Sequence, residues 1–278
     1  MRILHTSDWH LGRTLEGRDR FPEQVQFIDQ LCDVAEAEDV HLVLVAGDVY
    51  DTSNPPARAE ELYFDALERL SAGGKRAVVV IAGNHDSPDR IRAANPLAVK
   101  HGISLVGCPG DDLGPGGPDG GARRIRTGPG WLEIASPAWD EAAFIVTLAY
   151  PSEARLNEVL APSLEEKKMQ LAYSDRVARL VGQGLVSAGS AGVRLVVGHL
   201  FTNGGWECDS ERQIQLGGAF GVVPHAFANG ADYIALGHLH RPQEIGTSGA
   251  FCRYSGSPLS YSFSEADQQK EVVIVEVV

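Results

Sequence analysis

The stretch from His41 to Asp51 constrains the fold of this chain more than any other part of its 278 residues. Residues 42–46 are five consecutive apolar residues, mostly leucine and valine. A run of this length is too short for a helix and suits a strand buried on both faces. Gly47 ends this strand, and Asp48 follows at the carboxyl end, where open α/β sheets bind their ligands. A carboxylate has no obvious packing role there, so we interpret Asp48 as a ligand that bridges two metal ions.

The first half of the chain alternates between predicted strands and predicted helices. This order is typical of a parallel sheet in an α/β protein. The predicted strands are Arg2–Ser7, the central strand at 42–46, Arg76–Ala82 and Ile103–Val106, and the predicted helices are Phe21–Glu38, Ala57–Leu70 and Ser87–His101.

The second half is predicted to form another sheet that packs on the first. A strand at Ala143–Ala149 and a long amphipathic helix at Ser163–Val186 lead into it. Its predicted strands are short and rich in β-branched residues: Val193–Gly198, Tyr233–Gly237, Phe251–Tyr254 and Val272–Val278, with one helical segment at Pro224–Ala228.

A segment dense in glycine and proline, Pro109–Gly130, separates the two halves. We interpret it as a surface loop or a disordered insertion, without a function. Arg123, Arg124 and Arg126 lie on its far side, where they could form a phosphate-binding strip or belong to a solvated edge strand. The edge strand is the favoured alternative.

Composition limits the classes of protein that fit. No apolar run approaches the length of a membrane span, and the chain starts with a strand rather than a signal peptide. The cysteines form no CxxC pair, which favours reduced thiols in a cytoplasmic protein: Cys32, Cys108, Cys208 and Cys252. The net charge of −13 argues against nucleic acid as a ligand unless metal ions, a local basic strip or a partner holds it.

Five short segments carry side chains that bind metal ions in proteins, and most of them follow an apolar strand. They are Asp8-x-His10, Gly47-Asp48, Gly83-Asn84-His85, Gly198-His199 and Gly237-His238-x-His240. A glycine before the ligand lets the chain turn sharply and approach an ion closely. Mixed carboxylate, amide and imidazole ligands without thiolates suit Mn²⁺, Fe or Zn²⁺ better than Ca²⁺ or a structural zinc site.

Each of these segments alone occurs by chance in many proteins, and a lone histidine is usually an ordinary surface or core residue. The five together, each at the end of a predicted strand, indicate one composite two-metal site. The remaining histidines lack such context and are interpreted as structural: His5, most simply a buried strand residue, and His41, His101 and His225.

The order of these motifs resembles that of the calcineurin-like metallophosphoesterases. The flanking residues resemble more specifically the SbcD family, the nuclease subunits of bacterial SbcCD complexes and counterparts of the Mre nucleases. The matching stretches run from His5 to Gly12, Ala46 to Thr52, Ala82 to Ser87, Tyr233 to Gln243 and Tyr254 to Pro258, and Pro55-Pro56 belongs with them.

The resemblance implies an α/β fold, a metallophosphoesterase-type sandwich of two facing mixed β-sheets flanked by helices. It implies one nuclease domain over residues 1–278, interrupted by the insertion at about 109–130. The family's DNA-capping domain and the segment that grips its ATPase partner would follow the last strand, and we expect both to be absent from this chain.

The resemblance also implies roles for the site residues. The first ion would be held by Asp8, His10, Asp48 and His240, and the second by Asp48, Asn84, His199 and His238. His85 would meet the scissile phosphate or the leaving oxygen, a role that suits an imidazole. Asp51 is expected to hydrogen-bond His85 and orient it, the alternative being a turn cap.

The function that the resemblance implies is a Mn²⁺-dependent DNA nuclease, an exonuclease on duplex ends and an endonuclease on single strands or hairpins. Its partners would be an SbcC-like ATPase and a second copy of the chain, in the cytoplasm at the nucleoid. The alternative is a related phosphoesterase acting on nucleotides, small phosphoesters or phosphoproteins. Thr52 and Ala82 occupy positions where the superfamily's protein phosphatases usually carry arginine, which disfavours that branch. A scaffold with a relic site is a third class, and the intact ligand set argues against it.

Two further expectations concern surfaces. An apolar stripe on the predicted helix Ala57–Leu70 is wider than a solvated helix needs, which favours self-association there, with packing on the sheet as the alternative. Trp9 and Trp206 could stack on a nucleobase, and packing is the favoured use of both. The sequence identifies no other nucleic-acid-binding residues.

Overall fold

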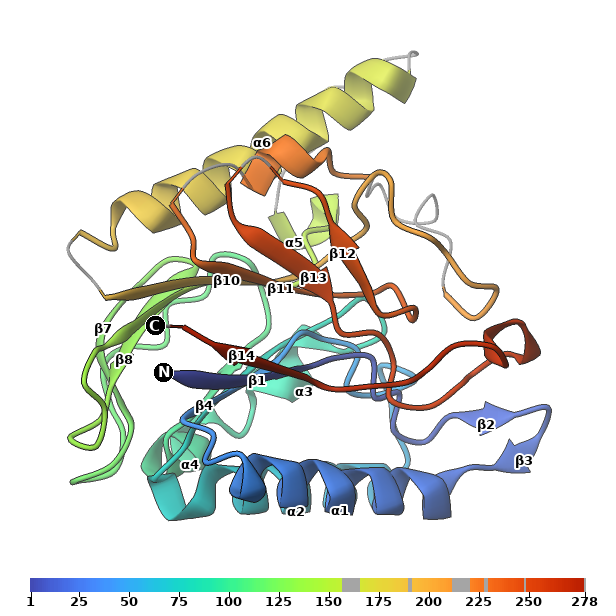
Figure 1. Ribbon diagram of the computed structural model, residues 1–278, viewed down its shortest axis with the longest axis horizontal. Helices are drawn as coiled ribbons and strands as arrows, with labels where there is room; N and C mark the ends of the chain where they lie inside the picture. Colours follow the sequence, from blue (N-terminus) through green and yellow to red (C-terminus); the bar gives the residue numbers. More distant parts are fainter. Residues whose placement is uncertain (157–165, 190–191, 212–220, 228–229, 248, 278) are drawn as a thin grey trace.

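The computed structural model describes residues 1–156, 166–189, 192–211, 221–227, 230–247 and 249–277. Two β-sheets face each other in the middle of the molecule, with helices on the outer face of each sheet (Figure 1). Both sheets contain parallel and antiparallel pairs. The predicted sandwich of two facing mixed sheets flanked by helices is therefore confirmed.

The first sheet has five strands, and its centre is the stretch that dominates the sequence. In spatial order they are β14 (Val273–Glu276), β1 (Arg2–Thr6), β4 (Leu42–Val45), β5 (Ala77–Ile81) and β6 (Ile103–Val106). All neighbours are parallel except β14, which pairs antiparallel with β1. The sequence wrongly assigned this last strand to the second sheet, because its local pattern does not show that it returns to the free edge of β1.

The second sheet has seven strands. In spatial order they are β12 (Gln243–Ile245), β13 (Phe251–Tyr254), β11 (Tyr233–Gly237), β10 (Val193–His199), β9 (Ala143–Leu148), β8 (Trp131–Ala135) and β7 (Arg123–Gly128). The arginine-rich segment is thus an edge strand, as the sequence favoured. Arg124 is buried there, and Arg126 forms an ion pair with Glu133 on β8.

The helices cover the outer faces of the sheets. Helices α1 (Phe21–Ala37) and α2 (Ala57–Ser71) lie under the first sheet, and α6 (Glu166–Val186) lies over the second (Figure 1). Side chains of β4 alternate between the layers: Leu42 and Leu44 belong to the core between the sheets, whereas Val43 and Val45 pack with the helices. This alternation explains why the strand is continuously apolar.

The predicted helix at Ser87–His101 is three short pieces in the structure, so this prediction was wrong in its length. The pieces are α3 (Pro88–Arg92), α4 (Asn95–Ala98) and the 3₁₀ turn η2 (Val99–His101). The Asn95 side chain bonds both backbone groups of Leu105, and Pro96 has no N–H to continue a helix through this point.

The remaining described elements are short. They are the hairpin β2 (Thr14–Leu15) and β3 (Arg18–Asp19), helix α5 (Glu153–Leu156) and the 3₁₀ turns η1 (Ala72–Gly74), η3 (Pro224–Phe227) and η4 (Phe263–Glu265). The predicted helical positions 163–165 and 228 lie outside the described residues. Over the described ranges, no helix combines the length and the apolar character that a membrane crossing requires.

The apolar stripe of α2 packs on the chain's own core. Its six residues are each at most 7% exposed: Ala59, Leu62, Tyr63, Ala66, Leu67 and Leu70. Ordinary packing on the sheet therefore explains the width of this stripe, and the inference of self-association from that width was wrong. The large apolar side chain that α2 does expose is Phe64, at 46%.

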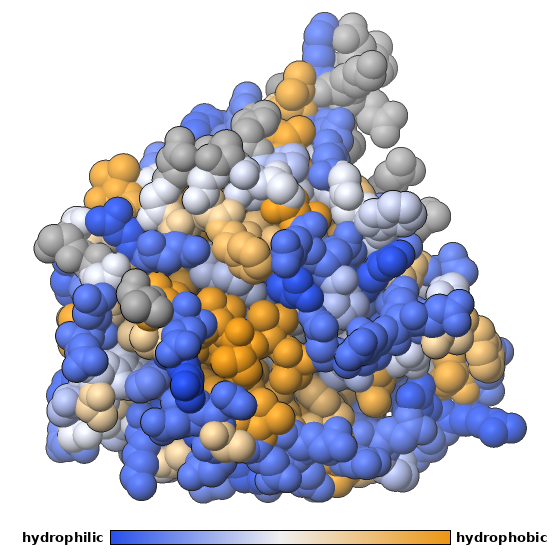
Figure 2. All heavy atoms as spheres, in the orientation of Figure 1, coloured by the Kyte–Doolittle hydropathy of each residue, from blue (hydrophilic) through white to orange (hydrophobic). Residues whose placement is uncertain are grey.

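A hollow lined by apolar and charged residues opens between β13 and β14 (Figure 2). Its volume is about 610 Å³, and Tyr233, Phe251 and residues 272–277 are among those that line it. None of the residues that line it is a candidate metal ligand. The hollow is therefore separate from the candidate metal ligands.

Candidate metal centre

The candidate ligands gather where strands of both sheets end. Asp8 and Asp48 follow β1 and β4, and backbone hydrogen bonds join the two loops, from Asp8 N to Gly47 O at 2.9 Å and from His10 N to Asp48 O at 3.0 Å. Asn84 follows β5, His199 is the last residue of β10, and the segment with His238 follows β11. The centre is therefore built from the carboxyl ends of strands in both layers.

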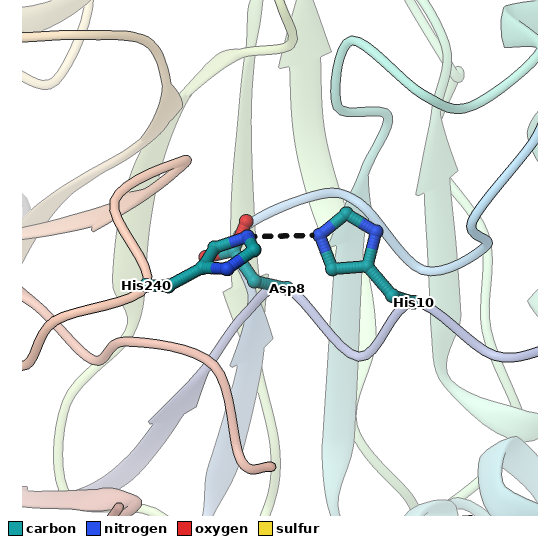
Figure 3. Close-up of side chains that lie close together, drawn as sticks. All are labelled: Asp8, His10 and His240. Carbon is teal, nitrogen blue, oxygen red and sulfur yellow. Dashed lines mark hydrogen bonds between the residues drawn. The ribbon is translucent and has the colours of Figure 1, made fainter. Parts of the chain in front are cut away.

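Asp8, His10 and His240 form the first cluster (Figure 3). All three are buried, and one ligand atom from each lies within 4.8 Å of the others. The Nε2 atoms of His10 and His240 are 3.1 Å apart. The Asp8 carboxylate also accepts hydrogen bonds from Ser7 Oγ at 2.5 Å and from His238 N at 3.1 Å, which fix its orientation.

Asp48, His199 and His238 form the second cluster, with Asn84 beside it. Asn84 Oδ1 lies 2.9 Å from His199 Nε2 and 3.0 Å from His238 Nδ1. The Asp48 carboxylate also approaches the first cluster: its Oδ2 is 3.4 Å from His199 Nε2 and 3.8 Å from His10 Nε2. This carboxylate faces both groups of ligands.

The backbone is strained at the candidate ligands. Of the seven non-glycine residues with positive φ among the described ones, four belong to the clusters: Asp8 (55°), His10 (45°), Asp48 (50°) and His238 (108°). Such conformations are uncommon outside glycine and gather at functional sites. The chain holds these side chains in place at a cost in backbone energy.

Two glycines make the close approach possible, as the sequence predicted. A Cβ on Gly47, whose φ is 90°, would lie 2.4 Å from His199 Nδ1, and a Cβ on Gly83 would lie 2.1 Å from Asp48 Oδ1. Any side chain at either position would displace a member of the second cluster.

Burial governs the charge state of the centre. It raises the pKa of Asp8 above its ordinary value and lowers the pKa values of His10 and His238, the latter to about 3. Burial alone would raise the pKa of Asp48, but the charges of His199, His85 and His10, with a hydrogen bond from His199, together hold it well below its usual range. Burial alone would lower the pKa of His199, but the Asp48 carboxylate raises it to about 9. The clusters thus offer carboxylates and neutral imidazoles, together with the ion pair of Asp48 and His199. A metal cation can replace the proton that His199 carries in this pair.

The donor set fits divalent metal ions. Carboxylate, amide and imidazole atoms converge, and no thiolate is among them. His10 Nδ1 is buried and has no hydrogen-bond partner in the described part of the chain. His199 Nδ1 instead lies 2.8 Å from Ala46 O, so that His199 Nε2 faces the second cluster. Orientation of one ring nitrogen by an outer partner is a usual feature of metal-ligating histidines.

His85 lies beside the clusters, and its contact with Asp51 is made through the Asp51 backbone. His85 Nδ1 is 2.6 Å from the backbone oxygen of Asp51, and His85 N donates to Asp48 Oδ1 at 2.8 Å. The Asp51 carboxylate instead lies 3.5 Å from Arg13 and 3.7 Å from His10 Nδ1. Asp51 therefore fixes the His85 ring through its main chain.

Several residues that support the centre were not predicted from the sequence. The Asp86 carboxylate accepts hydrogen bonds from the backbone N–H groups of Gly83, Val49 and Tyr50, and so ties the loop after β5 to the loop after β4. Burial raises its pKa to about 6. Arg155 donates to the backbone oxygens of Gly83 and Asp86 from the other side. The only sequence signal was the position of Asp86 in the Gly83–Ser87 motif.

The structure separates the two tryptophans. Trp9 is fully buried and donates to Thr6 Oγ1, so packing is its use, as favoured. Trp206 is 69% exposed, with the Arg241 guanidinium 5.4 Å above its ring, so packing does not explain it. His5 is a buried strand residue, as predicted, and it contacts Tyr233 Oη across the two sheets at 2.8 Å.

The calcineurin-like phosphoesterase family matches this chain over residues 1–242, and the chain belongs to that family. Within it, the chain is 45% identical over 276 residues to the SbcD subunit of nuclease SbcCD from Bacillus subtilis (strain 168), covering 99% of this chain and 66% of that protein. It is 33% identical over 281 residues to the protein of the same name from Rhodobacter capsulatus, covering 100% of this chain and 66% of the relative. For the protein of that name from Escherichia coli (strain K12), the identity is 34% over 278 residues, with 99% and 64% covered.

The resemblance to SbcD proteins that the motifs indicated is thereby confirmed. The chain spans just under two thirds of the length of these relatives.

Proposed function

We propose that this chain is a two-metal phosphodiesterase that cleaves DNA. The observation that carries the proposal is the position of Asp48, whose carboxylate faces both ligand clusters while His85 lies beside them outside either metal set. The first ion would be held by Asp8, His10, Asp48 and His240, and the second by Asp48, Asn84, His199 and His238. Mn²⁺ is the proposed metal, since it accepts mixed oxygen and nitrogen ligands.

When bound, a pair of divalent ions activates a water molecule and neutralises charge on the attacking and leaving oxygens of a phosphodiester. The chain's own residues supply orientation and a proton. Asp51 O holds His85 Nδ1, which leaves His85 Nε2 to face the clusters, 3.9 Å from Asp48 Oδ2. From there a His85 ring protonated on both nitrogens would contact the scissile phosphate and donate its Nε2 proton to the leaving oxygen.

DNA is the proposed substrate because the named relatives are nuclease subunits. The proposed activities are those of an exonuclease on duplex ends and an endonuclease on single strands or hairpins. It would do so as the nuclease subunit of an SbcCD-like complex with an SbcC-like ATPase at the nucleoid. The exposed Trp206 with Arg241 above it is a candidate contact for an unpaired base.

The net charge of −13 favours the second candidate, a phosphoesterase for nucleotides or other small phosphoesters. Two divalent ions would offset only four of these negative charges, so the chain would still have a negative net charge and would attract a polyanion weakly. The two candidates differ in what the chain recognises beyond the phosphate, while the chemistry at the centre is shared.

The test is a Mn²⁺-supplemented assay of linear duplex DNA beside bis-p-nitrophenyl phosphate over a range of salt concentrations. A nuclease with few phosphate contacts should cleave DNA at high enzyme concentration with a shallow salt dependence, since each contact adds about 0.9 to the log–log slope. Adding an SbcC-like partner should steepen it. Hydrolysis of the small ester with no cleavage of DNA under any condition would favour the second candidate.

We also propose that the chain forms a homodimer through the exposed face of α2. Phe64 is the large apolar side chain exposed there, and the prediction is that Phe64→Glu shifts the protein from dimer to monomer. Sedimentation velocity measures this directly. Leu171→Glu, at an apolar residue on α6 that is 53% exposed, is the matched control and should leave the dimer intact. Equal sedimentation of Phe64→Glu and the parent would contradict the proposal.

A further inference from the structure

The side of His240 that faces away from the clusters contacts a chain of buried and half-buried polar groups with no assigned role. Ser210 Oγ lies 2.7 Å from His240 Nδ1 and donates its proton to Glu265. Glu265 is completely buried, and Lys270 donates to its other carboxylate oxygen. We call these three residues, Ser210, Glu265 and Lys270, the relay.

The relay determines which nitrogen of His240 carries a proton. Because the Ser210 hydroxyl donates to the Glu265 carboxylate, it can only accept from the imidazole, so His240 Nδ1 carries the hydrogen. The lone pair of His240 then lies on Nε2, which faces His10 Nε2 at 3.1 Å in the first cluster (Figure 3). This tautomer is the one that a metal ion at the first cluster requires.

The same groups also fix the backbone of His240. Lys270 Nζ donates to His240 O at 3.0 Å and to Ser257 Oγ at 3.0 Å, and Ser257 N donates to His240 O at 3.1 Å. On the other side, His240 N donates to Glu211 Oε1 at 2.6 Å. The ring of His240 is therefore held by Ser210, and its main chain by Glu211, Ser257 and Lys270.

A buried carboxylate is costly unless its partners repay its desolvation. Glu265 has three side-chain or backbone donors besides Lys270, from Ser210, Ser257 and Tyr261. Replacement of Glu265 by an apolar residue would remove this cost, so packing alone does not explain why a charged residue lies here. The need to orient the metal ligand His240 explains it.

We propose that Glu265, with Lys270, is a positioning residue that acts through Ser210 to set the tautomer and direction of His240 and thereby the affinity of the first metal position. This inference rests on the proposed function, since it assumes that the first cluster holds a metal ion. The second metal position shares no side-chain contact with the relay in the described residues, so the effect should be confined to one of the two ions.

The experiment is a Mn²⁺ titration of the metal-free protein, followed by calorimetry and by electron paramagnetic resonance, for the parent, Glu265→Gln and Ser210→Ala. We expect Glu265→Gln to weaken one of the two ions about 10–100-fold, the range typical for loss of an outer partner, and to leave the other unchanged. The resonance spectrum should change from that of a coupled pair to that of a single ion at metal concentrations that fill both positions in the parent.

Ser210→Ala keeps the Glu265–Lys270 pair and removes only its link to His240, so it tests the same step even if Glu265→Gln fails to fold. The double variant should lose no more affinity than either single variant, because both interrupt one pathway. Glu133→Gln, a buried carboxylate on β8 paired with Arg126, is the matched control and should bind both ions like the parent.

Two ions bound with parental affinity in both Ser210→Ala and Glu265→Gln would overturn this inference and leave the proposed function standing. Equal weakening of both ions would also overturn it, because that result indicates a general structural role. Absence of metal binding in the parent would instead overturn the proposed function, and this inference with it.

Discussion

Replacing Asp48 with asparagine is expected to empty at least one metal position and to abolish phosphodiester hydrolysis. The Asp48 carboxylate lies 3.4 Å from His199 Nε2 and 3.8 Å from His10 Nε2, so this side chain of the second cluster also faces the first. Loss of a catalytic ion removes several kcal/mol of transition-state stabilisation, a fall in rate on the order of 10³-fold or more. Elemental analysis after gel filtration, together with turnover of bis-p-nitrophenyl phosphate, measures both effects.

The fold should survive this substitution, because an asparagine oxygen can still accept the hydrogen bond from His85 N. Circular dichroism of the metal-free protein checks this. Asp112→Asn, a change at an exposed carboxylate that bonds Thr127 and Gly114, is the control that should keep both ions. Two ions per chain in Asp48→Asn would refute the bridging role.

Replacing His85 with alanine is expected to lower turnover while both ions remain bound. His85 is held by the Asp51 backbone oxygen and lies outside both proposed ligand sets, so its removal takes away a proton donor rather than a ligand. General acid catalysis contributes roughly 10²–10⁴-fold, and the loss should fall in that range. The measurements are the rate at saturating Mn²⁺ and the number of ions bound.

His101→Ala, at a histidine in η2 away from the centre, is the matched control for this change and should retain full activity. A substrate with a better leaving group needs less help from an acid, so the deficit of His85→Ala should shrink with such a substrate. If His85→Ala loses an ion, His85 is a ligand and the proposed proton transfer is wrong.

The strands that end at the centre could be predicted from the sequence because their signals are local. The apolar run before Gly47 predicts a strand buried on both faces. The glycines before Asp48 and Asn84 predict a close approach of the backbone to the candidate ligands, which the structure contains. The five motifs were expected to converge, and Asp8, His10, Asp48, His199, His238 and His240 do lie together.

What could not be predicted depends on contacts between distant segments. Nothing local to residues 273–276 shows that β14 returns to β1, and nothing local to α2 shows whether its stripe meets a sheet or a partner. Asp51 was expected to hydrogen-bond His85 and orient it, but the sequence could not show that the backbone oxygen of Asp51 makes this contact. Glu265 carries no motif of its own, and its role emerges only when Ser210 and His240 are seen beside it.

The first cluster joins residues from opposite ends of the chain, since His10 and His240 are 230 positions apart. At the usual rate of about 5–20 residues per second, a ribosome needs on the order of ten to fifty seconds to synthesise the intervening chain. During that interval the nascent protein displays Asp8, His10 and Asp48 without the histidines that complete either ligand set. Ions that bind only the finished sandwich favour it by mass action. Metal supply during translation should therefore influence the yield of folded protein as well as its turnover.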